Sequence, residues 1–240
     1  MDEQSGARAT MHASLVSEAL RGGVRDYRYL LERGYSEVAA LKLVGDRRQL
    51  DAAQRSMLYR GVSPRAAAAV RRAKLTTALR GFDIAIDGLN VIYTMANYLY
   101  GRPLFIADDG LLRDAGEIHG HDPAPGPGPT LGDRVDEAVK LLLRDLGDRS
   151  PRRVLVYLDE QVSRSGELAS RLRRGLRDAR LQGDAQTLHS PDYVLKRVTQ
   201  GIIATSDSVI IDAARALVFD LARAALREAF GAVFIDIGAL

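Results

Sequence analysis

The sequence contains no cysteine among its 240 residues. This absence excludes disulfide bonds, thiolate metal sites and cysteine nucleophiles. No apolar run approaches the roughly 18 residues that a membrane-spanning helix requires. The N-terminal segment MDEQSGARATMHASL is acidic and then polar, unlike the charged and then apolar layout of a signal peptide. These absences predict a cytoplasmic protein with no membrane partner.

The residues that are present describe an ordinary globular protein, 46% hydrophobic and 27% charged. Its net charge of +3 hides an asymmetry, because the chain through Arg80 has 15 Lys and Arg against 8 Asp and Glu, whereas the remainder has 19 against 23. This distribution favours a basic part that attracts polyanions and an acidic part that holds cations. The alternative is that the arginines simply face solvent on helices.

Residues 1–80 are predicted to form a separate all-α basic module. Helical spacing of apolar residues indicates helices at about 25–33, 37–44, 52–60 and 64–74, with Ser36 and Asp51 as N-caps and Gly34 and Gly45 as ends. Residues 37–61 have the helix, turn and helix of a helix-turn-helix-like pair, in which Arg47 and Arg48 are predicted to contact nucleic-acid phosphates. A purely structural role is the alternative.

Residues 81–240 are predicted to form an α/β domain with a Rossmann-like, mainly parallel sheet flanked by helices. Apolar β-type runs at 82–86, 153–158, 201–205 and 232–237, with weaker ones at 103–106 and 186–188, alternate with helical stretches at 133–146, 165–181 and 208–230. Residues 119–130 form a proline- and glycine-rich insertion, in which His119 and His121 are expected to face solvent.

An aspartate follows each of three predicted strands: Asp87, Asp159 and Asp207. Ligands of open parallel sheets bind beyond the carboxyl ends of the strands, so these side chains are expected at one edge. Converging carboxylates repel one another, whereas Mg²⁺ or Mn²⁺ prefers oxygen ligands and activates water for attack on a phosphodiester. The alternative for each aspartate is an ordinary helix N-cap.

Two short motifs resemble those of the PIN and NYN nucleases. Asp87-Gly-Leu-Asn90 is similar to the first motif of that superfamily, Asp-Gly-x-Asn, and Thr205-Ser206-Asp207 is similar to its late Thr/Ser-Ser-Asp motif. The resemblance covers roughly residues 82–237. The whole chain, with Tyr35–Asp46 ahead of the nuclease-like part, also resembles a prokaryotic family described only as a domain of unknown function.

The nuclease resemblance implies roles for individual residues. Asp87 and Asp207 would be metal ligands, and Asp159 a further one. Asn90 would orient the first aspartate or a phosphate, and Thr205 or Ser206 would support the loop. Asp212 joins the candidate metal set, and the place of Asp108, Asp109 and Asp114 stays open.

A predicted helix directly after Asp159 is crowded with arginines. Their helical spacing puts several on shared faces, which favours contact with an RNA backbone beside the acidic site, although a solvated face is the alternative. The residues are Arg171, Arg173, Arg174, Arg177 and Arg180.

These observations together predict a Mg²⁺- or Mn²⁺-dependent ribonuclease, with Asp87, Asp159 and Asp207 at its centre. The alternatives are a non-catalytic RNA-binding or assembly protein with a degenerate PIN-like site, and a DNA-binding regulator that uses the N-terminal module. The sequence leaves the oligomeric state, homo-oligomers included, undetermined.

Overall fold

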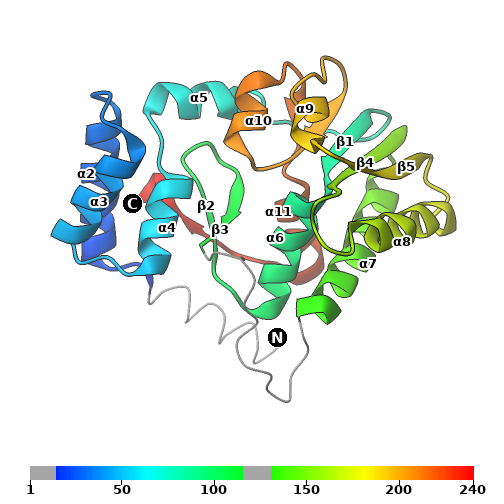
Figure 1. Ribbon diagram of the computed structural model, residues 1–240, viewed down its shortest axis with the longest axis horizontal. Coiled ribbons are helices and arrows are strands. Elements are labelled where there is room, and N and C mark those ends of the chain that lie inside the picture. Colours follow the sequence, from blue (N-terminus) through cyan, green and yellow to red (C-terminus); the bar gives the residue numbers. More distant parts are fainter. Residues whose placement is uncertain (1–14, 116–130) are drawn as a thin grey trace. The chain divides into compact units, whose positions relative to one another are not determined.

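The computed structural model describes residues 15–115 and 131–240, which fall into two compact units (Figure 1). Unit 1 contains described residues 15–72, 100–115 and 232–240, and unit 2 contains 73–99 and 131–231. The sequence predicts a single boundary near residue 80. In the structure, unit 1 also contains residues 100–115 and 232–240, which that boundary assigns to the α/β domain. The proline- and glycine-rich insertion, with His119 and His121, lies outside the described residues. None of the described helices is long and apolar enough to span a membrane.

Unit 1 begins with helices close to those that the sequence predicts. Ser36 caps α3 by accepting a hydrogen bond from the N–H of Ala39, and Asp51 and Gln54 form a capping box at the start of α4. Gly45 was expected to end α3, but the helix continues to Arg47 because Gly45 is buried with the Arg55 guanidinium packed against it. The helices are α2 (Glu18–Leu31), α3 (Glu37–Arg47), α4 (Ala52–Gly61) and α5 (Arg65–Ala73).

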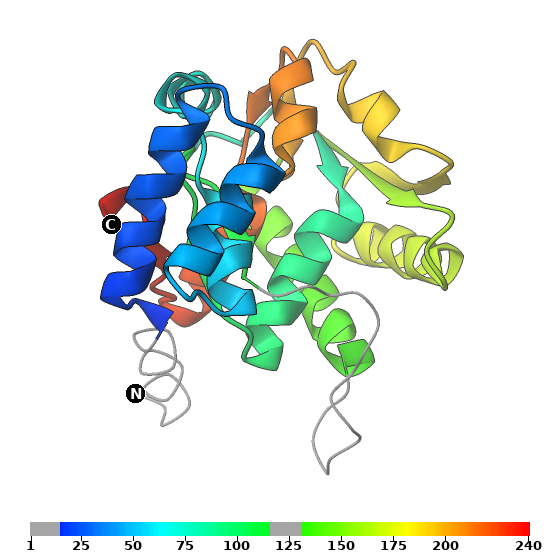
Figure 2. The same cartoon turned by 60° about the vertical axis from the view of Figure 1, so that its left-hand side comes forward.

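The same unit contains a three-stranded sheet made by later parts of the chain. Its order is β3-β2-β8, with β2 (Leu104–Ile106), β3 (Leu112–Asp114) and β8 (Ile235–Asp236). The runs at 103–106 and 232–237 therefore form strands, but not strands of the main sheet, because Phe105 and Ile237 are buried among the apolar residues of α2, α3 and α4. Those helices pack together in Figure 2, where they run from blue to cyan.

Buried ion pairs hold the β2–β3 segment in unit 1. Both side chains of the Asp109–Arg113 pair are almost inaccessible, at 1% and 7% exposure, and two hydrogen bonds of 2.7 and 2.9 Å join them. Asp108 accepts two hydrogen bonds from Arg28, and Asp114 accepts one from Arg60. The three aspartates whose role the sequence left open are thus engaged with arginines.

Unit 2 is built on a five-stranded parallel sheet of order β5-β4-β1-β6-β7. The α/β architecture with a parallel sheet flanked by helices confirms the coarse prediction. Strand β1 is central, and Ile84, Ala85 and Ile86 are buried on both of its faces. The strands are β1 (Asp83–Asp87), β4 (Arg153–Asp159), β5 (Gly183–Leu188), β6 (Ile202–Ala204) and β7 (Leu217–Val218).

The helices of unit 2 differ from the prediction in three places. The stretch 208–230 is divided into two helices by β7, because Leu217 and Val218 pair with β6. Two further helices, α6 and α9, were not predicted. Figures 1 and 2 show α7 and α8 on one side of β4 and β5, opposite α9 and α10. The helices are α6 (Gly88–Tyr100), α7 (Leu131–Arg149), α8 (Ser165–Asp178), α9 (Pro191–Leu195), α10 (Ser208–Ala213) and α11 (Leu221–Phe230).

We expect Arg113→Ala to destabilise the protein by about 3 kcal/mol, because the buried Asp109 carboxylate loses its bidentate partner and keeps the longer ion pair to Arg71, at 3.7 Å. Arg65→Ala is the matched control. It removes the partner of Glu32 from a pair in which Arg65 is 82% exposed, and it should cost at most about 1 kcal/mol. Urea titration of both variants measures the difference, and equal midpoints would contradict a structural role for the buried pair.

Candidate functional site

The candidate site begins at Asp87, the last residue of the central strand. Helix α6 starts at the next residue, Gly88. A Cβ atom on Gly88 would lie 2.5 Å from a methyl group of Leu158 and 3.0 Å from the carbonyl oxygen of Tyr157. A side chain at this position would clash with β4, so glycine is required at the junction of β1 and α6. This is a structural reason for the second residue of the Asp-Gly-Leu-Asn motif.

Hydrogen bonds join Asp87 and Asn90 to the loop that follows β6. The Thr205 hydroxyl donates to Oδ2 of Asp87 at 2.9 Å, and the backbone N–H of Asp207 donates to the Thr205 hydroxyl at 3.1 Å. Asn90 accepts at Oδ1 from both the N–H and the hydroxyl of Ser206, at 2.9 and 3.1 Å. The two motifs that are distant in sequence thus form one network at the carboxyl ends of β1 and β6.

The carboxyl group of Asp87 has a raised pKa. Burial raises its pKa to about 6, against hydrogen bonds from Thr205 and Asn90 that lower it, and the nearby Asp192 and Asp207 add to the increase. Asp192 was missed at the sequence level. It lies in the first turn of α9, directly after β5, so the rule that found the other aspartates also applies to it.

Asp207 is both a candidate ligand and the N-cap of α10. Its Oδ1 accepts hydrogen bonds from the N–H groups of Val209 and Ile210, at 2.7 and 3.4 Å. This confirms the N-cap alternative for Asp207. Its Oδ2 accepts no hydrogen bond from the described part of the chain, so capping uses only one of the two carboxylate oxygens.

Asp159 and Asp212 are placed less centrally. Asp159 ends β4, the neighbour of β1, and its Oδ1 accepts a hydrogen bond from the N–H of Gln161 at 2.8 Å. Asp212 is exposed in the last turn of α10, five residues beyond the cap. Asp192 and Asp207 are thus the carboxylates that act on Asp87, with Asp159 on the adjacent strand.

The donor set has the chemistry of a site for a hard cation. Aspartate oxygens suit Mg²⁺ and Mn²⁺, which are often held by one or two carboxylates with water in the remaining positions. The pKa of Asp87 is raised mainly by burial and further by the nearby Asp192 and Asp207, and a bound cation would favour the ionised form. However, no three His, Asp or Glu side chains within residues 15–115 and 131–240 form a group close enough to hold a metal ion. The residues fit an open site with few protein ligands.

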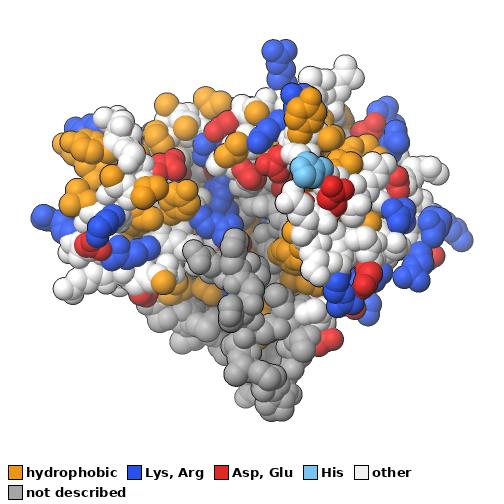
Figure 3. Space-filling model, in the orientation of Figure 1, with side chains coloured by type: hydrophobic (Ala, Val, Ile, Leu, Met, Phe, Trp, Pro, Cys, Tyr) orange, Lys and Arg blue, Asp and Glu red, His pale blue; other side chains and the backbone are white. Residues whose placement is uncertain are grey.

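The arginines of α8 do not border these carboxylates. Arg171 forms an ion pair with Asp136 of α7, and Arg173 donates to the carbonyl of Ala185 at 2.7 Å. Arg174, Arg177 and Arg180 are exposed. Arg177 and Arg180 lie at the end of α8 and in the turn before β5, which is the opposite edge of the sheet from Asp87. Figure 3 shows the basic side chains gathered over α8.

The N-terminal candidates lie in unit 1. Arg47 is exposed, whereas Arg48 pairs with Asp26 at 2.7 Å. Helix α4, the second of the helix-turn-helix-like pair, does not protrude, because its Met57 and Leu58 are fully buried in the core of this unit. The geometry gives no support to α4 as a recognition helix for DNA.

The raised pKa of Asp87 predicts a pH-dependent stability. An unfolded aspartate titrates near 3.9, so the folded state binds this proton more tightly, and ionisation of Asp87 lowers the free energy of unfolding as pH rises from about 4 to about 6. The Asp87→Asn variant has no carboxyl group at this position, so its free energy of unfolding does not fall for this reason. In chelator, its free energy of unfolding should increase relative to wild type by roughly 2–3 kcal/mol between pH 4 and pH 7.

Asp178→Asn, at an exposed position at the end of α8, is the control for this comparison. Its difference from wild type should stay constant over the same interval, as measured by urea titration at each pH. Parallel curves for Asp87→Asn and wild type would contradict the unfavourable burial of Asp87.

Comparison with known proteins divides the chain in two. A family model described as "Domain of unknown function (DUF5616)" matches residues 76–224, and one described as "Protein of unknown function (DUF434)" matches residues 19–74. An uncharacterised protein of Methanocaldococcus jannaschii is 31% identical over 188 residues, which are 78% of this chain and 86% of that protein. No solved structure matches. The chain belongs to the family of the DUF5616 domain, which spans the parallel sheet and the carboxylates at its edge.

Proposed function

We propose that the chain is a PIN-like, Mg²⁺- or Mn²⁺-dependent ribonuclease that hydrolyses RNA phosphodiesters at the carboxyl ends of β1 and β6. The observation that carries this proposal is the network of Asp87, Asn90, Thr205, Ser206 and Asp207. It joins the two motifs that resemble the PIN and NYN nucleases. At neutral pH, the burial of the ionised Asp87 carboxylate lowers the stability of the fold. A purely structural role for Asp87 would not explain this loss, whereas a bound cation would offset it.

The chain's own residues prepare the site before any ligand binds. The Thr205 hydroxyl fixes the Asp87 carboxylate, and Asn90 fixes the loop that carries Asp207. With a pKa of about 6, Asp87 is mostly ionised at neutral pH. Asp87 and Asp207 would hold the cation, with Asp159 and Asp192 beside them. The cation would activate water and neutralise charge on a phosphoryl oxygen.

One observation favours a second candidate, a non-catalytic RNA-binding or assembly protein that keeps the fold with a degenerate site. Within the described ranges, fewer than three ligating groups converge at any point. Capping of α10 also occupies one oxygen of Asp207. The two candidates differ in whether the carboxylates bind a cation, which can be measured without knowing the substrate.

We expect Mn²⁺ to stabilise the wild type and not Asp207→Asn. At about a hundred times its dissociation constant, the ion adds roughly 2.7 kcal/mol, which is a rise of several degrees in the thermal unfolding midpoint. Asparagine caps helices about as well as aspartate, so the variant removes the charge and retains α10. Asp212→Asn is the matched control and should retain the rise. An equal midpoint of the wild type in Mn²⁺ and in chelator would favour the non-catalytic candidate.

We also expect cleavage of a labelled single-stranded RNA in Mn²⁺ to slow by about a hundredfold or more in Asp87→Asn, because metal sites lose comparable activity even when only an outer ligand is changed. Gel analysis of initial rates measures this, with Asp178→Asn as the control. Cleavage by Asp87→Asn at the wild-type rate would exclude this site as the source of the activity.

A further inference from the structure

The main sheet of unit 2 is covered unevenly. Burial alternates along β4, where Val154, Val156 and Leu158 are buried on the side of α8. The other side of β4 and β5 is only partly covered, and Gln186 and Arg153 are exposed there. We call this side of the two strands the half-covered face. Strand β1, in contrast, is buried on both faces. Helix α9 packs on this side against β1 and β4, and it leaves the amino-terminal part of β4 and the neighbouring part of β5 only partly covered.

The strand register places the half-covered face next to the candidate site. Tyr157 of β4 is paired with Asp87 on one side and with Gln186 of β5 on the other. Paired residues of neighbouring strands point to the same face and lie about 4.8 Å apart along the hydrogen-bonding direction. The half-covered face therefore begins directly beside the Asp87 carboxylate, with an aromatic side chain in the next position.

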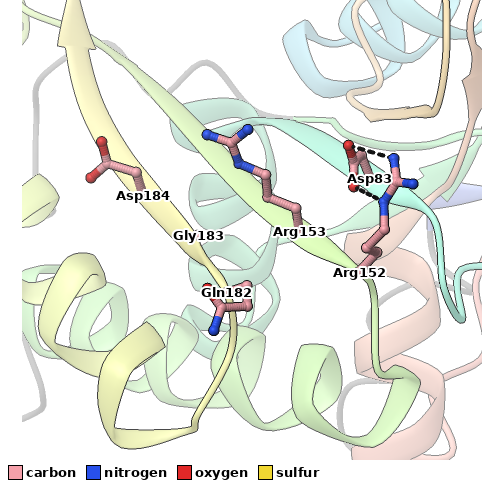
Figure 4. A pocket seen from close by; sticks show the side chains of 6 residues that line it. All are labelled: Asp83, Arg152, Arg153, Gln182, Gly183 and Asp184. Carbon is pink, nitrogen blue, oxygen red and sulfur yellow. Dashed lines mark hydrogen bonds and ion pairs between the residues drawn. The ribbon is translucent and has the colours of Figure 1, made fainter.

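The other end of this face is a cavity of about 560 Å³ at the amino ends of β1, β4 and β5. Arg152 is engaged there, because it forms a bidentate pair with Asp83 at 2.7 and 2.9 Å. Arg153 lies between Asp83 and Asp184, as Figure 4 shows, and its guanidinium group makes no hydrogen bond or ion pair within the described residues. It is a cationic donor available to a ligand.

Tyr157 connects the two ends. Burial raises the pKa of its phenol, while Arg153 acts to lower it and Asp184 to raise it. The side chain therefore lies within electrostatic reach of both residues that flank the cavity. From Asp159 back to Arg153 the strand is seven residues long, about 20 Å at the usual rise per residue.

We propose that the half-covered face binds a single strand of RNA, with a base stacked on Tyr157 and a phosphate at Arg153, and that it leads this strand to Asp87. The inference rests on the proposed function and specifies its substrate. Single-strand sites combine an aromatic platform for bases with basic groups along the backbone. Tyr157, Gln186 and Arg153 provide the platform, an amide for a base edge and the cation.

A duplex fits this surface poorly. The pairing of Arg152 with Asp83 and the presence of Asp184 beside Arg153 leave little net positive charge for gripping two phosphate backbones. Bases stacked inside a duplex also do not expose a face to Tyr157. The surface therefore favours unpaired bases over a double helix.

The test is binding of a short labelled single-stranded RNA to the full chain in chelator, measured by fluorescence anisotropy. We expect Tyr157→Ala to weaken binding about tenfold and Tyr157→Phe to bind like the wild type, because the ring and not the hydroxyl makes the stack. Arg153 is exposed, so Arg153→Glu tests the surface without disturbing the core. It should weaken binding about tenfold and flatten the salt dependence.

Arg144→Glu makes the same charge change at an exposed position of α7, a helix on the other side of the sheet, and is the matched control. It should bind like the wild type. Equal affinities of wild type, Tyr157→Ala and Arg153→Glu would overturn the inference. Tighter binding of the same RNA annealed to its complement would overturn it as well.

The Mn²⁺ stabilisation involves no RNA, so it reports on the proposed function separately. Stabilisation by Mn²⁺ together with unchanged RNA binding by both variants would retain the metal site and overturn the half-covered face as its substrate path. Loss of binding by both variants without Mn²⁺ stabilisation would retain the face as a single-strand site and overturn the proposed chemistry.

Discussion

Strand β1 is buried on both faces, and this constraint decides what surrounds the carboxylate at its end. Ile84 and Ile86 are packed under helices, so the chain leaves the sheet at Asp87 with little water around it. A carboxylate in such a place needs hydrogen-bond donors. Thr205 supplies one, from a loop that can reach Asp87 only because β6 is the other neighbour of β1. The central strand thereby fixes the partners of the site as well as its position.

Arginines of the N-terminal segment serve mainly inside unit 1. Arg28 and Arg60 form ion pairs with Asp108 and Asp114, and Arg72 donates to the carbonyl oxygen of Asp108. The positive balance of the first 80 residues therefore includes charges that are neutralised by aspartates from residues 108–114. A count of charges along the sequence therefore overestimates the attraction of the first 80 residues for polyanions. The arginine of each pair is counted with these residues, whereas its aspartate partner is counted with the later part of the chain.

In unit 2, the candidate carboxylate site lies away from the arginine-rich end of α8. Helix α8 runs back from the carboxyl edge of β4, so its last arginines lie at the opposite edge of the sheet from Asp87. The half-covered face instead extends continuously from Asp87 through Tyr157 to Arg153. The sparsely charged half-covered face thus lies nearer to the carboxylates than the strongly charged end of α8 does, and the proposed RNA path follows this face.

The sequence by itself determined the elements whose signals are local. The apolar runs of β1, β4 and β6 predicted buried parallel strands, and the side chains of Ser36 and Asp51 predicted helix starts, because a cap depends only on groups within one turn. The alternation of strands and helices predicted a parallel sheet, in which Asp87, Asp159 and Asp207 follow strands that end at the same edge. Only the tertiary structure decided that Phe105 and Ile237 leave the main sheet, that Asp192 approaches Asp87 and that Asp108 pairs with Arg28. Each of these contacts joins residues far apart in the chain, and packing rather than local preference selects them.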